Sequence, residues 1–145
     1  MMEHLLIRTF VGAAGGLLMA VGTGLLFQPH DFYAANDIIL ADNPSLMSEI
    51  RAPAALLMVS ATFMMSSVGR IRFLQPALAL IAVIYGSYGS ARLLSLILDG
   101  TPSQSLVQAM VLELAIANLA AIAWLRFRSA SSQYSNAGKC KTFQE

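Results

Sequence analysis

An arginine interrupts a long apolar segment in the stretch YGSYGSARLLSLILDG, residues 85–100, where it occupies position 92. This stretch is the second half of an apolar run from Phe73 to Leu98, which is long enough to cross a bilayer as a helix. A charged side chain in hydrocarbon costs roughly 2.5–3.5 kcal/mol on insertion scales, so it normally has a partner, a route to water or a function. Arg92 therefore raises the question of which other segment supplies its partner.

The composition indicates that lipid is the main solvent of this chain. Of its 145 residues, 57% are hydrophobic and only 12% are charged. An ordinary soluble domain carries about 25% charged residues. The formal net charge is +1 and the sequence holds no dense patch of Lys and Arg, which argues against a nucleic-acid partner.

Four apolar segments predict an all-α, four-helix transmembrane bundle formed by residues 1–128. Each segment has close to the roughly 20 residues that a helix needs to cross about 30 Å of hydrocarbon. The first segment can also be read as a cleaved signal peptide, but its apolar core is longer than the about 7–15 residues typical of one. The predicted helices cover residues 9–27, 44–69, 73–98 and 102–125.

Local signals mark two of the predicted helix starts. Asn43 is expected to cap the second helix, with Pro44 at the first helical position, where its missing N–H is harmless. Thr101 and Gln104 have the spacing of a capping box, which predicts that the fourth helix begins at Pro102.

The remaining segments are predicted to be loops and a tail. Residues 28–48 are polar and acidic, and they are expected to form a loop with a short interfacial piece around residues 38–40. Residues 129–145 contain too few apolar side chains to build a core, which predicts a disordered cytoplasmic tail. Cys140 lies in this tail, where a reactive or lipidated thiol and an incidental free thiol are the alternatives.

Charged residues outside the apolar segments divide between the two ends of the bundle. Lys and Arg concentrate in the N-terminus, the second connection and the tail, whereas Asp concentrates in the first and third connections. Cytoplasmic segments carry an excess of Lys and Arg, so both termini are predicted to lie in the cytoplasm. The basic set is Arg8, Arg70, Arg72, Arg126, Arg128, Lys139 and Lys141, and the acidic set is Asp31, Asp37, Asp42 and Asp99.

The same topology predicts a partner for Arg92. The third and fourth helices form an antiparallel hairpin in which Arg92 and Glu113 reach overlapping depth, so we expect these two side chains to pair. Glu49 and Arg51 lie at the start of the second helix. They would extend the pair into an intramembrane polar cluster that reaches toward the outer surface.

Two interpretations of this cluster stay open. It can be a neutral set of paired charges that fixes the register of the helices, or it can line an outward-open polar pocket for a lipid headgroup, a small solute or a proton. In the second case Tyr85, Tyr88 and Asn118 would line the pocket. Such side chains are more typical of hydrogen bonds between helices than of ligand contacts.

The sequence contains no recognisable catalytic, cofactor or metal motif. His4 and His30 have no partners at metal-ligand spacing, and the glycines belong to apolar helices and not to a phosphate-binding loop. The leading interpretation is a non-enzymatic binding or accessory protein with no cofactor and no metal. The alternative is a small proton- or solute-coupled transporter. The expected partners are the lipid bilayer, a lipid headgroup or small solute, and another membrane protein or a second copy of the chain.

Several short motifs resemble a known family. They are Glu49-Ile50-Arg51-Ala52 in the second helix, Gly89-Ser90-Ala91-Arg92 and Asp99-Gly100-Thr101-Pro102 at the end of the third, and Glu113-Leu114 in the fourth. Over about residues 5–126 the chain resembles an uncharacterised family of small bacterial four-helix membrane proteins, domain of unknown function 4345. The resemblance implies a multi-pass protein of the bacterial inner membrane and implies nothing about activity. Small multidrug exporters also have four helices, but their essential carboxylate lies in the first helix, where this sequence has none.

Overall fold

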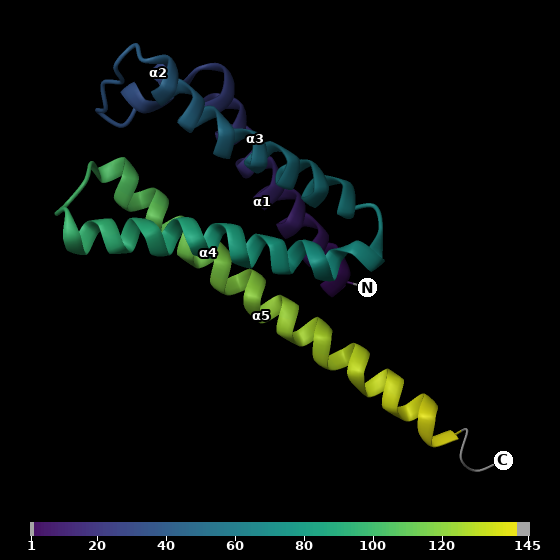
Figure 1. The fold of residues 1–145 in the computed structure, drawn as a ribbon. Helices are drawn as coiled ribbons and strands as arrows, with labels where there is room; N and C mark the ends of the chain where they lie inside the picture. Colours follow the sequence, from purple (N-terminus) through teal and green to yellow (C-terminus); the bar gives the residue numbers. More distant parts are fainter. Residues whose placement is uncertain (1, 142–145) are drawn as a thin grey trace.

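Residues 2–141, the part of the backbone that the computed structural model describes, fold into helices joined by short connections. Side chains are described from residue 5 to residue 128. The elements are α1 (Met2–Phe27), α2 (Pro29–Ala34), α3 (Pro44–Ser67), the short 3₁₀ helix η1 (Ile71–Phe73), α4 (Leu74–Leu98) and α5 (Gln104–Lys141), as Figure 1 shows.

Four stretches of these helices are long and apolar enough to cross a membrane. They match the four apolar segments of the sequence to within a few residues, although the helix α5 itself continues beyond the fourth stretch. The all-α prediction is confirmed for the described residues, and helices of this length and composition indicate a multi-pass membrane protein. The four stretches are Leu5–Phe27, Pro44–Ser67, Ile71–Leu98 and Gln104–Arg128.

The long helices form two antiparallel hairpins, in which α1 packs along α3 and α4 packs along α5 (Figure 1). Glycines allow the helices of each hairpin to approach closely. A Cβ atom on Gly22 of α1 would lie 2.9 Å from Met58 Cγ of α3, and one on Gly89 of α4 would lie 2.8 Å from Leu114 Cγ of α5. Small residues of this kind are typical of helix interfaces in lipid, where dispersion contacts provide much of the attraction.

The two hairpins join through the first half of α4. Leu74, Leu78 and Ile81 of α4 are fully buried, and they form one apolar cluster with Val11 of α1 and Met64 of α3. We call this end of the bundle the basic end, because the N-terminal part of α1 and the α3–α4 connection supply Arg8, Arg70 and Arg72 of the basic set.

At the opposite end the hairpins diverge, so that α2 and the α4–α5 connection lie apart (Figure 1). We call it the acidic end, because its two connections carry the acidic set of the sequence. Gly100, which follows the C-cap residue Asp99 of α4, adopts a φ of +95°. A left-handed residue just beyond a helix is a common C-terminal signal, and glycine adopts it without strain.

A short helix, α2, occupies part of the segment that was predicted to be a loop. Pro29 stands at its start with a φ angle that suits a first helical turn. Phe32 packs on Gly24 of α1, where a Cβ atom would lie 2.7 Å from its ring. Residues 38–40 are not helical, and they follow the left-handed residue Asp37, whose φ is 63°.

The predicted helix starts are correct for α3 and wrong for α5. The Asn43 side chain accepts hydrogen bonds from two backbone N–H groups of the first turn of α3, at 2.9 and 3.4 Å. In contrast, α5 begins at Gln104, two residues later than the Thr101 capping box predicted. The carbonyl of Ser103 accepts the first hydrogen bonds of this helix, so Ser103 takes the place expected for Thr101.

The end of α5 also differs from the prediction. Its backbone continues to Lys141, whereas the sequence predicted a helix end near Leu125 and a disordered tail from residue 129. Residues 126–137 contain no proline or glycine, and extending an existing helix fixes one residue for each new hydrogen bond. The side chain of Cys140 lies outside the described residues.

Candidate functional site

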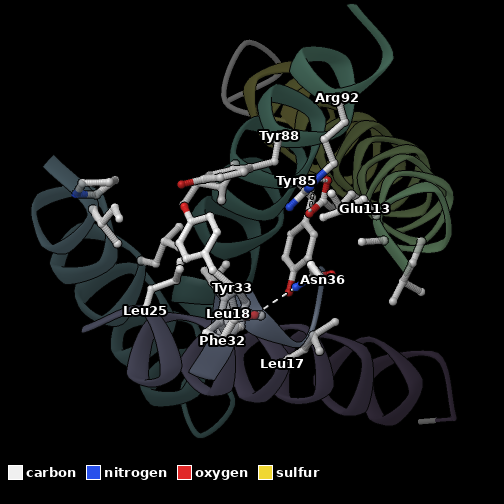
Figure 2. Close-up of a pocket in the computed structure, with 18 of the residues that line it drawn as sticks. Leu17, Leu18, Leu25, Phe32, Tyr33, Asn36, Tyr85, Tyr88, Arg92 and Glu113 are labelled. Atoms are coloured by element: carbon white, nitrogen blue, oxygen red, sulfur yellow. Dashed lines mark hydrogen bonds and ion pairs between the residues drawn. The ribbon is translucent and has the colours of Figure 1, made fainter. Parts of the chain in front are cut away.

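Arg92 and Glu113 form the ion pair expected from the sequence (Figure 2). Arg92 Nε, on α4, donates hydrogen bonds to Oε1 and Oε2 of Glu113, on α5, at 3.3 and 3.1 Å. The two side chains are 33% and 17% exposed, respectively. Gly89 lies one turn before Arg92 on α4, and the side chain of Leu114 on α5 packs directly on Gly89. The glycine therefore lets α5 approach closely enough for the carboxylate to reach the guanidinium.

The ion pair lies in the wall of a cavity of about 440 Å³ between the two hairpins. This volume falls in the range of about 300–1,000 Å³ typical of small-molecule sites. The five α-helices and the α2–α3 connection contribute to its wall, which is mostly apolar. Its apolar side chains are Leu17, Leu18, Val21, Leu25, Phe32, Ile38, Ile50, Pro53, Leu57, Ile84, Leu106, Ala109 and Leu112.

Four aromatic rings contribute to the wall of the cavity. Phe32 and Tyr33 come from α2, and their rings meet edge to face with centroids 6.1 Å apart. Tyr85 and Tyr88 come from α4. Figure 2 shows the hydroxyl ends of Tyr33 and Tyr88 directed toward one another. α2 and α4 thus face each other across the cavity with aromatic side chains.

The two tyrosines of α4 have different hydrogen-bonding roles. The Tyr85 hydroxyl is buried and donates to the Ala14 carbonyl of α1 at 2.6 Å. This bond joins the two hairpins at the bottom of the cavity. The Tyr88 hydroxyl makes no hydrogen bond to another described residue, so it is available to a molecule in the cavity.

Glu49 also lines the cavity, from α3, but two other residues expected at the site do not. Glu49 and Arg51 are both exposed, but Arg51 follows Glu49 by two residues, which turns it about 200° around the helix. Asn118 is exposed on α5, and its Nδ2 donates to the Leu114 carbonyl within the same helix at 2.8 Å. The cluster predicted from the sequence is therefore reduced to Glu49, Arg92 and Glu113.

Sequence reasoning missed Tyr33 and Asn36 as wall residues. Asn36 Nδ2 donates to the Phe32 carbonyl at 3.0 Å, which ties the connection after α2 back to that helix (Figure 2). Pro29, as a helix-start signal, could have indicated α2. No feature of the sequence indicates that α2 folds over the gap between the hairpins.

The cavity can therefore hold a molecule by apolar contact and by a few polar groups. Its wall offers two carboxylates, one guanidinium and the hydroxyls of Tyr33 and Tyr88. The terminal Nη groups of Arg92 make no further hydrogen bond within the described part of the chain. Among the described residues, no group of three or more His, Cys, Asp or Glu side chains could hold a metal ion.

Four membrane-length helices, with an ion pair between two of them and a cavity beside it, define a small helical multi-pass membrane protein. The chain belongs to the family described as domain of unknown function (DUF4345), whose model matches residues 6–125. The match extends from α1 into α5 and includes the whole wall of the cavity. No curated protein and no solved structure matches the chain.

Proposed function

We propose that this protein is a non-enzymatic binding protein that holds a small amphiphilic molecule in the cavity between its hairpins. The observation that carries the proposal is the combination of about 440 Å³ of mostly apolar space with a charged pair in its wall. Ligand sites typically combine an apolar wall with a few polar groups that orient the ligand. A pair that only fixed the register of α4 and α5 would need no open space beside it.

The distribution of charged residues along the chain supports an orientation of the protein in the membrane, and with it a depth for the cavity. Cytoplasmic segments carry an excess of Lys and Arg, so the basic end and both termini would face the cytoplasm of a bacterial inner membrane. The cavity would then lie in the outer half of the bilayer. Asp37→Cys in a Cys140→Ser background should react with a membrane-impermeant maleimide added outside cells. Labelling only after the membrane is opened would contradict this orientation.

A pair of matched variants on α5 tests the binding proposal. Ala109 lines the cavity, whereas Ala115 is exposed on the outside of the same helix. The protein is purified in a mild detergent, and the small molecules and lipids that remain bound are identified by mass spectrometry. The natural protein and Ala115→Phe should retain the same molecule, and Ala109→Phe should lose it because the added ring fills the cavity.

Either of two results would overturn binding in this cavity. One is that the natural protein retains nothing beyond bulk lipid. The other is that Ala109→Phe and Ala115→Phe retain the same molecule in the same amount. Circular dichroism and size-exclusion chromatography of both variants verify that each remains folded.

Proton- or solute-coupled transport is the second candidate, and the position of Glu113 favours it. This carboxylate lies in a membrane-length helix, lines the cavity and keeps 17% of its side chain exposed. Ionisable groups in such positions often mark proton or solute pathways. Protein in liposomes should then move protons when a retained molecule is added, and Glu113→Gln should abolish that movement. A pH-sensitive dye inside the liposomes measures this movement. If the natural protein gives no change in the dye signal, transport is contradicted and binding is the remaining function.

A further inference from the structure

The charges in the cavity wall do not balance. The wall contains the carboxylates of Glu49 and Glu113 and only one cationic side chain, Arg92. Arg92 is already paired with Glu113. Glu49 is exposed and makes no ion pair or hydrogen bond through its side chain with another described residue, and Arg51 does not line the cavity. The wall therefore has one negative charge in excess.

The aromatic side chains of the wall would suit a cation. The faces of Phe32, Tyr33 and the two tyrosines of α4 carry partial negative charge, and cations with apolar substituents bind such faces most strongly where water is excluded. An aromatic wall alone would equally suit a neutral ring. The aromatic wall and the excess carboxylate together favour a cation over a neutral molecule.

The surroundings of the cavity have the same sign. The cavity lies in the half of the bundle toward the acidic end, where the connections carry Asp31, Asp37, Asp42 and Asp99. Fields from such groups raise the local concentration of cations and lower that of anions. An anion would also have to approach Glu113 in order to reach the Nη groups of Arg92.

We infer that the cavity binds a monovalent organic cation that carries an apolar group, with the cationic centre between Glu49 and the aromatic rings of α2 and α4. This inference rests on the proposed binding function and specifies its ligand class. The apolar group would lie deeper, against the leucines of α1 and α5. Exchange of protons or electrons plays no part in this binding.

Three probes that share a benzyl group test the sign of the charge. Benzyltrimethylammonium is cationic, neopentylbenzene is its neutral isostere, and benzylsulfonate is a tetrahedral anion. Binding to the protein in phosphatidylcholine nanodiscs is measured by isothermal titration calorimetry, with empty nanodiscs as the blank. The cation should bind about tenfold more tightly than either of the other two probes.

Two carboxylate variants identify the responsible charge. Glu49→Gln should weaken binding of benzyltrimethylammonium about threefold or more and leave neopentylbenzene unchanged, because it removes only the unpaired charge. Asp99→Asn removes a charge from the same end of the bundle but not from the cavity wall, and should change neither affinity by more than about twofold. Thermal unfolding of both variants verifies that they fold.

Equal affinity for the three probes, tighter binding of benzylsulfonate or no binding of the cation would overturn the inference. So would an equal loss of affinity in Glu49→Gln and Asp99→Asn. These results leave the proposed binding function standing if the natural protein still retains a molecule that Ala109→Phe loses. The ligand class and the binding function can therefore fail separately.

Discussion

The two halves of the bundle use similar apolar helices in different ways. At the basic end, Leu74, Leu78 and Ile81 of α4 are completely buried between α1, α3 and α5. Toward the acidic end, the hairpins diverge around the cavity, and α4 instead presents Tyr88 and Arg92 to it. The buried half joins the hairpins, and the open half leaves space that side chains do not fill.

This contrast shows where the chain departs from the best packing available to it. Close packing to native density is the norm in folded proteins, and a site for another molecule requires a local exception. Here the exception coincides with the only intramembrane ion pair found among the described residues. The two halves should therefore differ in how much each of their side chains contributes to the free energy of unfolding.

The largest expected effect comes from breaking the ion pair. Glu113→Gln leaves the Arg92 guanidinium without its counter-charge in an apolar helix, which should lower the free energy of unfolding by about 3 kcal/mol. The value lies at the low end for buried pairs because both side chains are partly exposed. Equilibrium unfolding of the purified protein in mixed detergent micelles measures it.

A double variant distinguishes loss of the pair from damage to α5. Arg92→Met combined with Glu113→Gln removes both charges, so it should recover more than half of the stability lost in Glu113→Gln alone. If the double variant is less stable than Glu113→Gln, the unpaired arginine is not the cause of the loss. If Glu113→Gln is as stable as the natural protein, the pair does not stabilise the hairpin at all.

The ion pair also shows what could be predicted from the sequence. An arginine in an apolar segment is costly enough to require a partner, and antiparallel topology places Glu113 at a matching depth. The four helices were also predictable, because each is a continuous run of apolar residues in the sequence. So was the Asn43 cap, which depends on residues next to each other.

The cavity could not be predicted in this way, because contacts between distant residues form it. Phe32 on Gly24 positions α2, and the bond from Tyr85 to Ala14 joins residues 71 positions apart. The failure at Arg51 and Asn118 has a related cause. Whether a side chain faces the cavity depends on how its helix is rotated about its own axis. The apolar residues of these helices are distributed nearly uniformly around their axes, so the sequence does not indicate this rotation.

Matched leucine variants compare the two halves directly. Leu78→Ala at the basic end should lower the free energy of unfolding by about 2–3 kcal/mol, because the surrounding side chains lose their dispersion contacts around a fully buried site. Leu106→Ala only enlarges a cavity that is already present, so it should cost about 1 kcal/mol or less. Unfolding titrations of both variants provide the comparison. Equal losses would mean that the cavity is filled and packed in the isolated protein.

Two glycines of α4, one turn apart, test the close approach that supports the ion pair. A Cβ atom on Gly89 would lie 2.8 Å from Leu114, whereas one on Gly86 would lie 3.7 Å from the Ala117 side chain, at ordinary contact distance. Gly89→Ala should therefore cost about 1–2 kcal/mol, and Gly86→Ala should be neutral or stabilising. Thermal unfolding compares the two. A neutral Gly89→Ala would show that α5 can move away from α4 at no cost.

The smallest expected effect concerns the hydrogen bond that joins the two halves. Tyr85→Phe removes the donor to the Ala14 carbonyl, and hydrogen bonds between membrane helices contribute about 0.6 kcal/mol on average, so the loss should be about 1 kcal/mol or less. Tyr88→Phe is the matched control, because its hydroxyl has no hydrogen-bond partner among the described residues and its removal should leave stability unchanged.

Amide hydrogen exchange offers a finer measure than global unfolding. In Tyr85→Phe, exchange should quicken around Ala14 in α1, since the hairpins would separate more easily from the cavity side. Faster exchange in Tyr88→Phe instead would mean that the open half, and not the buried bond at its base, holds the hairpins together.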